Sequence, residues 1–229
     1  MTEFLIPAVT IYLLTLFIIS STIFKLITDI NNHMNKLILT DADGVLLRWE
    51  QPFRAWMQTH NYIINDSGKN NYLLHNHFTN ATPVETKLMA RRFNESAAIG
   101  FLPPLRDSVQ YVKKLHEEHG YKFRVITSLS TDKHAGMLRE INLRHLYGDA
   151  IESVVCLDTG ADKDQALEPY RDSGLFWIED KFENFELGVK LGLKSILVEH
   201  GHNFARDTTG GMRVKSWEEI YDIVISSSI

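Results

Sequence analysis

From Lys36 onward, short apolar segments alternate with longer amphipathic ones, and this alternation restricts the folds that the chain can adopt. The apolar segments predict strands at residues 36–40, 121–127, 151–157, 175–179 and 195–199. The amphipathic segments predict helices at residues 105–119, 131–146, 163–171, 182–191 and 217–226. Strands and helices in this order form a parallel sheet with helices on both faces. The sequence therefore predicts an α/β fold with a Rossmann-like, doubly wound parallel sheet.

One interval is too long for this pattern. About 60 residues separate Asp43 from the next core helix, more than a single strand-to-helix connection needs. Helical patterns occur within it at residues 51–60, 72–78 and 82–94, and Thr82-Pro83-Val84-Glu85 reads as a capping box. We expect residues 49–101 to form a small helical cap over the carboxyl edge of the sheet, where open α/β sheets bind ligands. Residues 34–48 and 102–229 would form the core.

The first 33 residues differ in character from the rest. Residues 4–24 contain no charged side chain, and as a helix they would span about 31 Å, close to the thickness of a bilayer. Two interpretations stay open. The segment is an N-terminal transmembrane anchor, with Lys25 and Lys36 placing the following domain in the cytoplasm. Alternatively it is upstream sequence that is not normally translated, because Met34 stands directly before the first strand. Membrane contact is expected only if residues 4–24 are retained.

The bulk composition argues against several classes of function. The 229 residues carry a net charge of −5 without a long basic segment, so we expect no nucleic acid polymer as partner. Cys156 is the only cysteine, which excludes an intrachain disulfide and favours a reducing compartment such as the cytoplasm. Within its predicted strand it reads as a small buried hydrophobic residue. The composition does not predict an oligomeric state.

The first predicted strand ends on two carboxylates, in the motif Asp41-Ala42-Asp43-Gly44. Residues spaced i, i+2 in extended chain lie on one face, about 6–7 Å apart. Gly44 lets the chain turn away without a steric clash. One carboxylate could then attack an electrophile or bind a cation while the other moves a proton.

Further polar residues follow the other predicted strands. Thr127 and Ser128 can offer hydroxyl and N–H groups to an anion, Lys163 begins a helix, and Glu179 and Asp180 end a strand. Each has an ordinary alternative role, as a helix cap, a solvated lysine or acids at a helix N-terminus. Their shared order at successive strand ends argues for one site.

This order of motifs resembles the haloacid dehalogenase superfamily of phosphohydrolases, from Lys36 to about Gly201. The resemblance implies that Asp41 attacks phosphorus and forms an aspartyl-phosphate. It implies that Asp43 protonates the leaving oxygen and then activates water, a role that dehalogenation would not need. Thr127, which matches the family's second motif, would hold the phosphoryl oxygens together with Ser128 and Lys163.

The same resemblance implies a Mg²⁺ site. Asp41, Asp180 and the backbone carbonyl of Asp43 would be the ligands, oxygen donors of the kind Mg²⁺ prefers. Here the fourth motif reads Glu179-Asp180, which differs slightly from the usual pattern. We therefore expect Asp180 on the metal and Glu179 either behind it or as an alternative ligand.

Insertion of a cap at this point is the C1 cap arrangement of that superfamily. The helical make-up of this cap and the sequence Asp43-Gly-Val-Leu-Leu-Arg-Trp-Glu-Gln-Pro-Phe53 resemble the 5'(3')-deoxyribonucleotidase branch. Those enzymes carry an aromatic residue eight positions after the nucleophile that packs against the nucleobase, and Trp49 occupies that position here. Arg48, by contrast, stands where they tend to carry an acid. Phe53 and Trp56 we expect in the cap's own apolar core.

The resulting hypothesis is a Mg²⁺-dependent phosphatase of a small phosphorylated metabolite, with a nucleoside 5'-monophosphate the favoured substrate. A sugar-phosphate phosphatase or phosphomutase is the alternative within the same superfamily. A membrane-tethered protein that binds a phosphorylated ligand without turnover is the alternative from another class.

Overall fold

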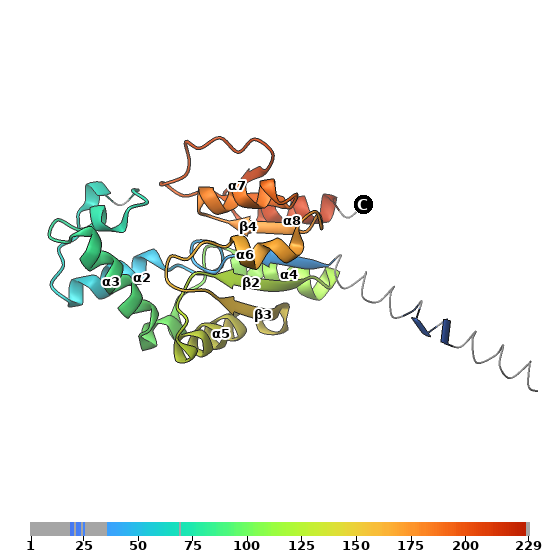
Figure 1. Ribbon diagram of the computed structural model, residues 1–229, viewed down its shortest axis with the longest axis horizontal. Helices are drawn as coiled ribbons and strands as arrows, with labels where there is room; N and C mark the ends of the chain where they lie inside the picture. The colour runs from blue at the N-terminus through green and yellow to red at the C-terminus, as the bar shows by residue number, and fades with distance from the viewer. Residues whose placement is uncertain (1–18, 21, 24, 26–35, 69, 228–229) are drawn as a thin grey trace, which may run out of the picture. The chain divides into compact units, whose positions relative to one another are not determined.

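The computed structural model describes residues 19–20, 22–23, 25, 36–68 and 70–227 (Figure 1). Residues Ile38–Ile229 form one compact unit. Most of the apolar segment at residues 4–24 lies outside the described residues, so the two interpretations of it stay predictions. Within the described residues, no helix combines the length and the apolarity needed to cross a bilayer.

The core is a six-stranded sheet with the strand order β3-β2-β1-β4-β5-β6. The strands are β1 (Leu37–Thr40), β2 (Lys122–Thr127), β3 (Ile151–Cys156), β4 (Phe176–Glu179), β5 (Lys194–Val198) and β6 (Met212–Val214). The registered pairs β1–β4, β2–β3, β4–β5 and β5–β6 are all parallel. The sequence predicted the first five to within one residue at every end and missed β6, a three-residue edge strand in which only Val214 is buried.

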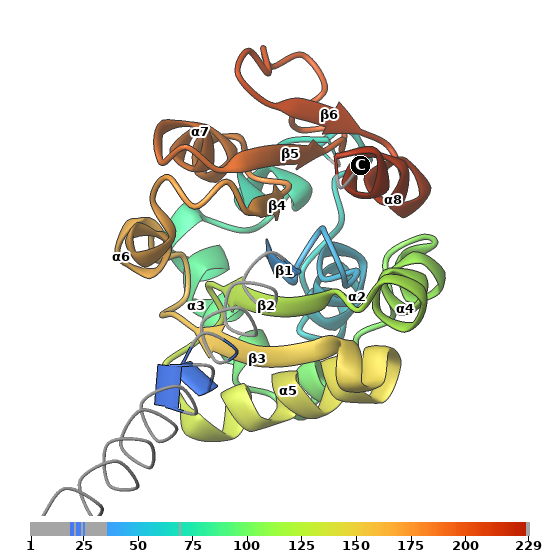
Figure 2. The same ribbon diagram turned by 90° about the vertical axis from the view of Figure 1, so that its right-hand side faces the viewer.

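Helices cover both faces of the sheet, as predicted. They are α4 (Ser108–His119), α5 (Lys133–Tyr147), α6 (Asp164–Leu167), α7 (Phe182–Lys190) and α8 (Trp217–Ser226). Viewed along the strands, α6 and α7 lie on one face and α4 and α8 on the other (Figure 2). The predicted helix at residues 163–171 is shorter than expected. It becomes a 3-10 turn at Glu168–Tyr170, because Pro169 cannot donate the backbone hydrogen bond that an α-helix requires.

The burial of β1 explains why its end is held rigidly. All four of its residues are buried, and Ile38, Leu39 and Thr40 pair with Phe176, Trp177 and Ile178 of β4. The Asp41 N–H continues this ladder by donating to the Ile178 carbonyl at 2.9 Å. Farther along, Trp217 of α8 donates its indole N–H to the Val45 carbonyl, also at 2.9 Å. The segment carrying Asp41 and Asp43 is thus fixed at both ends.

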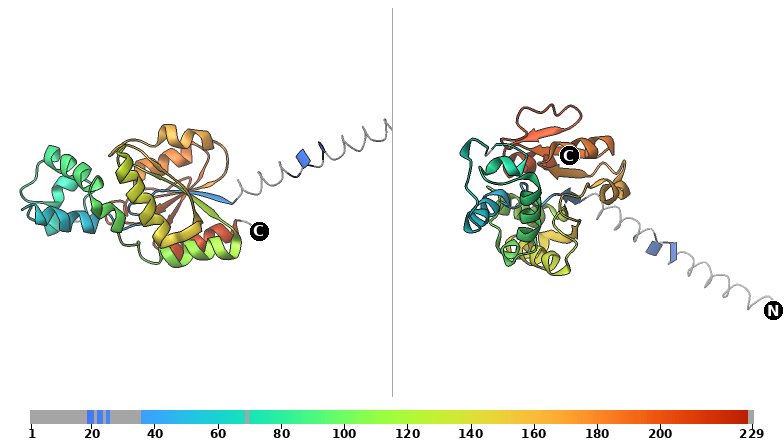
Figure 3. Two further views of the ribbon diagram at one scale, coloured as in Figure 1. Left: turned by 90° about the horizontal axis from the view of Figure 1, so that it is seen from below. Right: turned by 60° about the vertical axis from the view of Figure 1, so that its left-hand side comes forward.

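A lobe of helical elements between Glu50 and Phe101, called the cap below, lies beside the sheet (Figures 1 and 3). Its elements are α2 (Glu50–Thr59), α3 (Pro83–Asn94) and 3-10 turns at Asp66–Gly68, Leu74–His77 and Ala97–Phe101. The capping box is present, with Thr82 and Glu85 each accepting the other's N–H. Phe53 is fully buried in the lobe, as expected, whereas Trp56 is only partly buried against the same cluster.

The predicted helix at residues 72–78 is wrong in type and length. The chain makes a four-residue 3-10 turn, Leu74–His77, instead. Polar side chains compete there for backbone partners: Asn71 accepts from the Leu73 N–H, and the His77 ring donates to the Asn71 carbonyl at 2.6 Å. Such local bonds favour turns over α-helix.

Candidate active site

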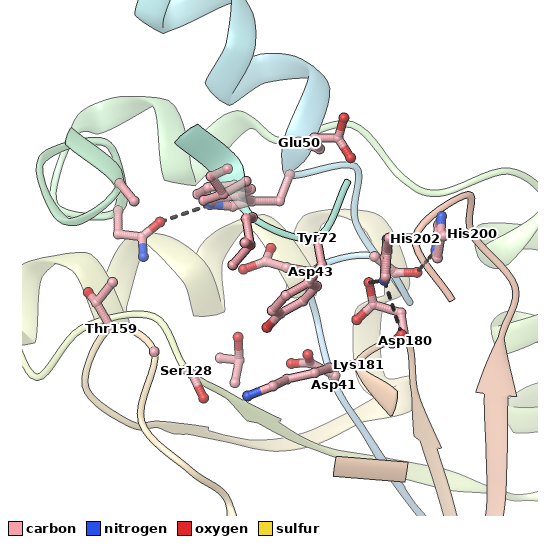
Figure 4. A pocket seen from close by; sticks show the side chains of 18 of the residues that line it. Asp41, Asp43, Glu50, Tyr72, Ser128, Thr159, Asp180, Lys181, His200 and His202 are labelled. Carbon is pink, nitrogen blue, oxygen red and sulfur yellow. Dashed lines mark hydrogen bonds and ion pairs between the residues drawn. The ribbon is translucent and has the colours of Figure 1, made fainter. Parts of the chain in front are cut away.

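The carboxyl ends of β1, β2 and β4 meet around one cavity of about 760 Å³ (Figure 4). Every residue that the sequence singled out lines it, namely Asp41, Asp43, Trp49, Thr127, Ser128, Lys163, Glu179 and Asp180. The parallel register explains this convergence, since neighbouring strands of the sheet end at the same edge. The cap supplies the opposite wall.

Lys163 lies at the centre of the core wall. Its side chain is 1% exposed, and Nζ is 2.8 Å from Asp41 Oδ2 and 2.8 Å from Glu179 Oε2. Burial alone would lower the pKa of this ammonium group, but the Asp41 and Glu179 carboxylates outweigh burial and raise it above the usual value. Lys163 is therefore a fixed positive charge beside Asp41.

Asp41, Glu179 and Asp180 form an acidic cluster whose ligand oxygens all lie within 4.8 Å of one another. Burial raises the pKa of Asp180 well above its usual range, and the Glu179 and Asp41 carboxylates raise it further. Burial likewise raises the pKa of Glu179 to about 7, against the opposing influence of Lys163. Three carboxylates this close repel one another, so a bound cation would stabilise the cluster.

The two acids of the fourth motif have different surroundings. Glu179 is fully buried and both of its oxygens accept hydrogen bonds, one from Lys163 Nζ and one from the Lys181 N–H at 3.0 Å. The Asp180 side chain is 18% exposed and faces the cavity. Gly44 makes room for it: with φ at +76°, a Cβ on Gly44 would lie 2.2 Å from Asp180 Oδ2.

The hydroxyls of Thr127 and Ser128 differ in whether they already have a hydrogen-bond partner. Thr127 is 1% exposed, and its Oγ1 has no hydrogen-bond partner among the described residues. Ser128 Oγ donates to the Ala161 carbonyl at 2.8 Å and so holds the loop before Lys163. A buried hydroxyl without a partner is costly unless a ligand satisfies it.

Asp43 forms an ion pair that the sequence did not suggest. Arg139 of α5 donates from Nη1 to Asp43 Oδ1 at 2.6 Å and from Nη2 to Oδ2 at 2.9 Å. Burial raises the pKa of Asp43 and the nearby Asp41 charge adds to this, while Arg139 opposes both. The sequence does carry a sign of this role. Arg139 occupies the same buried face of its helix as Ala135 and Leu143, where an apolar residue is usual.

The loop after β5 contributes two histidines that sequence reasoning also missed. His200 donates its Nε2–H to the Gly44 carbonyl at 2.7 Å, and burial lowers the pKa of His200 to about 4. The His202 ring is stacked parallel to the His200 ring, with ring centroids 5.6 Å apart, and its Nε2 lies 3.3 Å from the Asp180 carbonyl oxygen. Asn203 donates to the same Asp180 carbonyl at 2.7 Å. This loop thereby ties together the segments that carry Asp43 and Asp180.

On the cap side, Trp49 is half-buried and held by neighbours. It stacks on Phe53 with ring centroids 4.6 Å apart, and its indole N–H donates to Asn94 Oδ1 at 2.8 Å. Tyr72, not predicted as a site residue, projects from the cap into the cavity (Figure 4). Burial raises the pKa of the Tyr72 phenol and the Asp180 carboxylate raises it further, so the phenol stays neutral.

Comparison with known proteins gives one curated relative and several solved structures. No protein-family model matches the chain. An uncharacterised 32.4 kDa protein from the Gp30-rIII intergenic region of enterobacteria phage T4 is 25% identical over 139 residues, which are 59% of this chain and 49% of the phage protein. The match thus spans about half of the phage protein's length, and that protein's function is itself undescribed.

The solved structures that resemble this chain include haloacid dehalogenase-like hydrolases. A hydrolase of that family from Streptococcus pneumoniae superposes with a TM-score of 0.59 at 13% identity, over 82% of this chain and 97% of the other. CbbY from Rhodobacter sphaeroides gives 0.54 at 14% identity, over 81% and 96%. A similar hydrolase from Burkholderia xenovorans gives 0.51 at 11% identity, over 84% and 98%. The chain therefore has the fold of the haloacid dehalogenase-like hydrolases.

Proposed function

We propose that this protein is a Mg²⁺-dependent phosphomonoester hydrolase that works through an aspartyl-phosphate on Asp41. The observation that carries the proposal is the arrangement around the Asp41 carboxylate. The buried Lys163 ammonium lies 2.8 Å from it, and the unpartnered Thr127 hydroxyl lines the same cavity. A nucleophilic carboxylate flanked by a fixed cation and a free buried donor suits an anionic electrophile.

The phosphoryl group would be held by donors from β2 and from the segment before α6. Thr127 Oγ1 and Lys163 Nζ supply a hydroxyl and a positive charge. The Ser128 hydroxyl is used by the Ala161 carbonyl, so we assign Ser128 the lesser part of shaping this loop. Phosphate monoesters hydrolyse extremely slowly in water, and enzymes accelerate this reaction by up to ~10²¹-fold. Stabilising the negative charge of the phosphoryl group is therefore the main requirement.

The residues present fit a Mg²⁺ ion. Asp41, Asp180 and the carbonyl of Asp43 would hold it. Glu179 would instead fix Lys163, because the Glu179 side chain is fully buried whereas that of Asp180 is partly exposed toward the cavity. When bound, the ion supplies positive charge against the repulsion between a carboxylate and a dianionic phosphoryl group.

Asp43 would transfer the protons. In the first step an Asp41 oxygen bonds to phosphorus, the bond from phosphorus to the leaving oxygen breaks, and that oxygen takes a proton from the Asp43 carboxyl group. In the second step water bonds to phosphorus, the bond to Asp41 breaks, and Asp43 takes a proton from the water. The raised pKa of Asp43 suits a group that must carry a proton in one step and lose it in the next.

For the substrate, we propose a nucleoside 5'-monophosphate. The cavity is large enough for a metabolite of that size, and Trp49 lines the wall opposite Asp41 with one ring face packed on Phe53. A sugar phosphate is the second candidate, since the similarly folded CbbY was solved in complex with phosphate and with xylulose-1,5-bisphosphate. A ligand-binding role without turnover would not need a proton donor at Asp43.

The experiment is a panel of nucleoside monophosphates and sugar phosphates, assayed with and without Mg²⁺. We expect release of phosphate that requires Mg²⁺ and is fastest with a nucleotide. An Asp41→Asn variant controls for a contaminating phosphatase. Faster release from sugar phosphates would move the assignment to the second candidate, and no release from any ester would refute the proposed activity.

A further inference from the structure

Arg139 is a charged side chain where the fold would accept an apolar one. It is fully buried on the second turn of α5. Burying a guanidinium group is costly unless its donors are satisfied. Both terminal nitrogens bind Asp43, Nε is unpartnered within the described part of the chain, and no other polar partner is recorded there.

Attachment of α5 to the core does not require this pair. Ala135, Leu143 and Tyr147 of the same helix are buried in the apolar core, and Asn142 donates to the Leu102 carbonyl at 3.1 Å. Arg144, one turn later and more exposed, donates to the Ile151 carbonyl at 2.9 Å. A methionine of similar length at position 139 would keep this packing, so the charge has another use.

The geometry of the contact indicates that use. A planar guanidinium with two parallel bonds fixes both oxygens of a carboxylate, and therefore the plane of the group, which a lysine cannot do. Each Asp43 oxygen accepts one bond from Arg139 and keeps a second lone pair for a transferable proton. The Asp43 side chain is 24% exposed toward the cavity, so it remains within reach of a substrate.

We propose that Arg139 is a positioning residue that holds the Asp43 carboxyl group in the orientation needed to pass its proton to the leaving oxygen. The inference rests on the proposed phosphatase function and adds a residue to it. Arg139 would act only through Asp43, without touching the substrate.

The dependence on the leaving group separates this role from a purely structural one. Phenyl phosphate releases a strongly basic phenolate that needs a proton as it departs, whereas p-nitrophenyl phosphate releases a weakly basic one that hardly does. Well-placed general acids contribute about 10²–10⁴-fold. We expect Arg139→Met to lower kcat/KM, which reports the first step alone, by about 100-fold for phenyl phosphate and by less than about 10-fold for p-nitrophenyl phosphate.

Two further variants make the test secure. In an Asp43→Asn background, Arg139→Met should have no additional effect on the ratio of the two rates, because the partner through which it acts is gone. Arg144→Met, on the same helix but away from the cavity, should leave the ratio unchanged. If Arg139→Met fails to fold, Arg139→Lys decides, since it keeps the charge and loses the two-pronged contact.

The outcomes are distinct. Unequal losses that disappear in the Asp43→Asn background support the proposal. Equal losses for both esters, with an active wild type, overturn the role of Arg139 and leave the proposed function standing. A wild type that hydrolyses neither ester in Mg²⁺ refutes the proposed function and the role of Arg139 with it.

Discussion

The two walls of the cavity are built on different principles. The core wall is charged, buried and tightly bonded: Lys163 is 1% exposed and links two carboxylates at 2.8 Å each. The cap wall mixes aromatic with polar and aliphatic side chains, and its aromatic ones are more open: Trp49 is half-buried, and Tyr72 is 51% exposed in a segment of short turns. A wall that holds charged groups at fixed, short distances suits chemistry on a phosphoryl group, whereas a mixed, less constrained wall suits selection among substrates. The following predictions test this division.

The largest effect should come from Asp41. Asp41→Asn removes the proposed nucleophile while keeping a side chain of the same shape, so we expect turnover of any phosphomonoester to fall by roughly 10⁴-fold or more. Circular dichroism should show an unchanged fold. A variant that still hydrolyses p-nitrophenyl phosphate would show that Asp41 is not the nucleophile.

Lys163→Met should impair both activity and stability. Loss of the charge beside the attacking carboxylate should slow turnover about 10²–10³-fold. It also leaves Asp41 and Glu179 as facing buried carboxylates, which should cost about 3–5 kcal/mol in the free energy of unfolding. Denaturant unfolding without Mg²⁺ measures this cost. A fully stable variant would mean that the lysine does not hold the acids together.

Mg²⁺ should stabilise the folded protein, and the two acids of the fourth motif should respond differently to its addition. A saturating ion, at about 100 times its dissociation constant, should add about 2.7 kcal/mol. Asp180→Asn should abolish the rise in Tm on adding Mg²⁺, while Glu179→Gln should keep most of it because Glu179 already serves Lys163 and Lys181. The opposite pattern would exchange their roles.

On the cap wall, Trp49→Ala should affect substrate preference and leave the chemistry intact. An aromatic stacking contact contributes about 0.5–1.5 kcal/mol, so KM for nucleotides should rise about 2- to 13-fold. KM for p-nitrophenyl phosphate should change less, and Trp56→Ala, in the same cap but absent from the cavity lining, serves as control. Equal rises for all substrates would argue against base stacking.

The smallest effect concerns His200 and pH. Burial holds the pKa of His200 at about 4, below its usual 6.5, so the unfolded chain takes up this proton first and the folded state loses stability as pH falls from 6.5 toward 4. Allowing for partial exposure, this loss is about 1 kcal/mol, or ~2–4 °C in Tm. His200→Gln keeps a donor for the Gly44 carbonyl and should be less sensitive to acid than wild type. Identical Tm–pH curves would exclude this contribution.

The sequence predicted most of the core because its signals are local. Strand runs such as residues 121–127 and the polar residues that follow them appear in the chain itself, and parallel pairing then brings Asp41, Thr127 and Asp180 to one edge. The short edge strand β6 and the turn Leu74–His77 escaped prediction because three or four residues carry too little periodicity.

The residues that escaped prediction are those whose meaning depends on tertiary contacts. Arg139 is 96 positions from Asp43 in sequence, and His200 is 156 positions from Gly44. The sequence around Arg139 or His200 does not indicate which residue either side chain contacts. Only Arg139 could have been noticed in the sequence, as a charged residue at an otherwise apolar, buried position of a helix. That position does not indicate which acidic residue it pairs with.

The central claim is that Asp41 becomes phosphorylated. The most direct measurement is to mix the Asp43→Asn variant with Mg²⁺ and a substrate that does not need an acid, such as p-nitrophenyl phosphate, quench in acid, and locate the phosphate by peptide mass spectrometry. Because Asp43 is proposed to activate the water of the second step, the phosphoenzyme should accumulate. We predict an acyl phosphate on Asp41 and on no other residue. A burst of p-nitrophenol with Asp41 unmodified, or a phosphate on another side chain, would contradict the account.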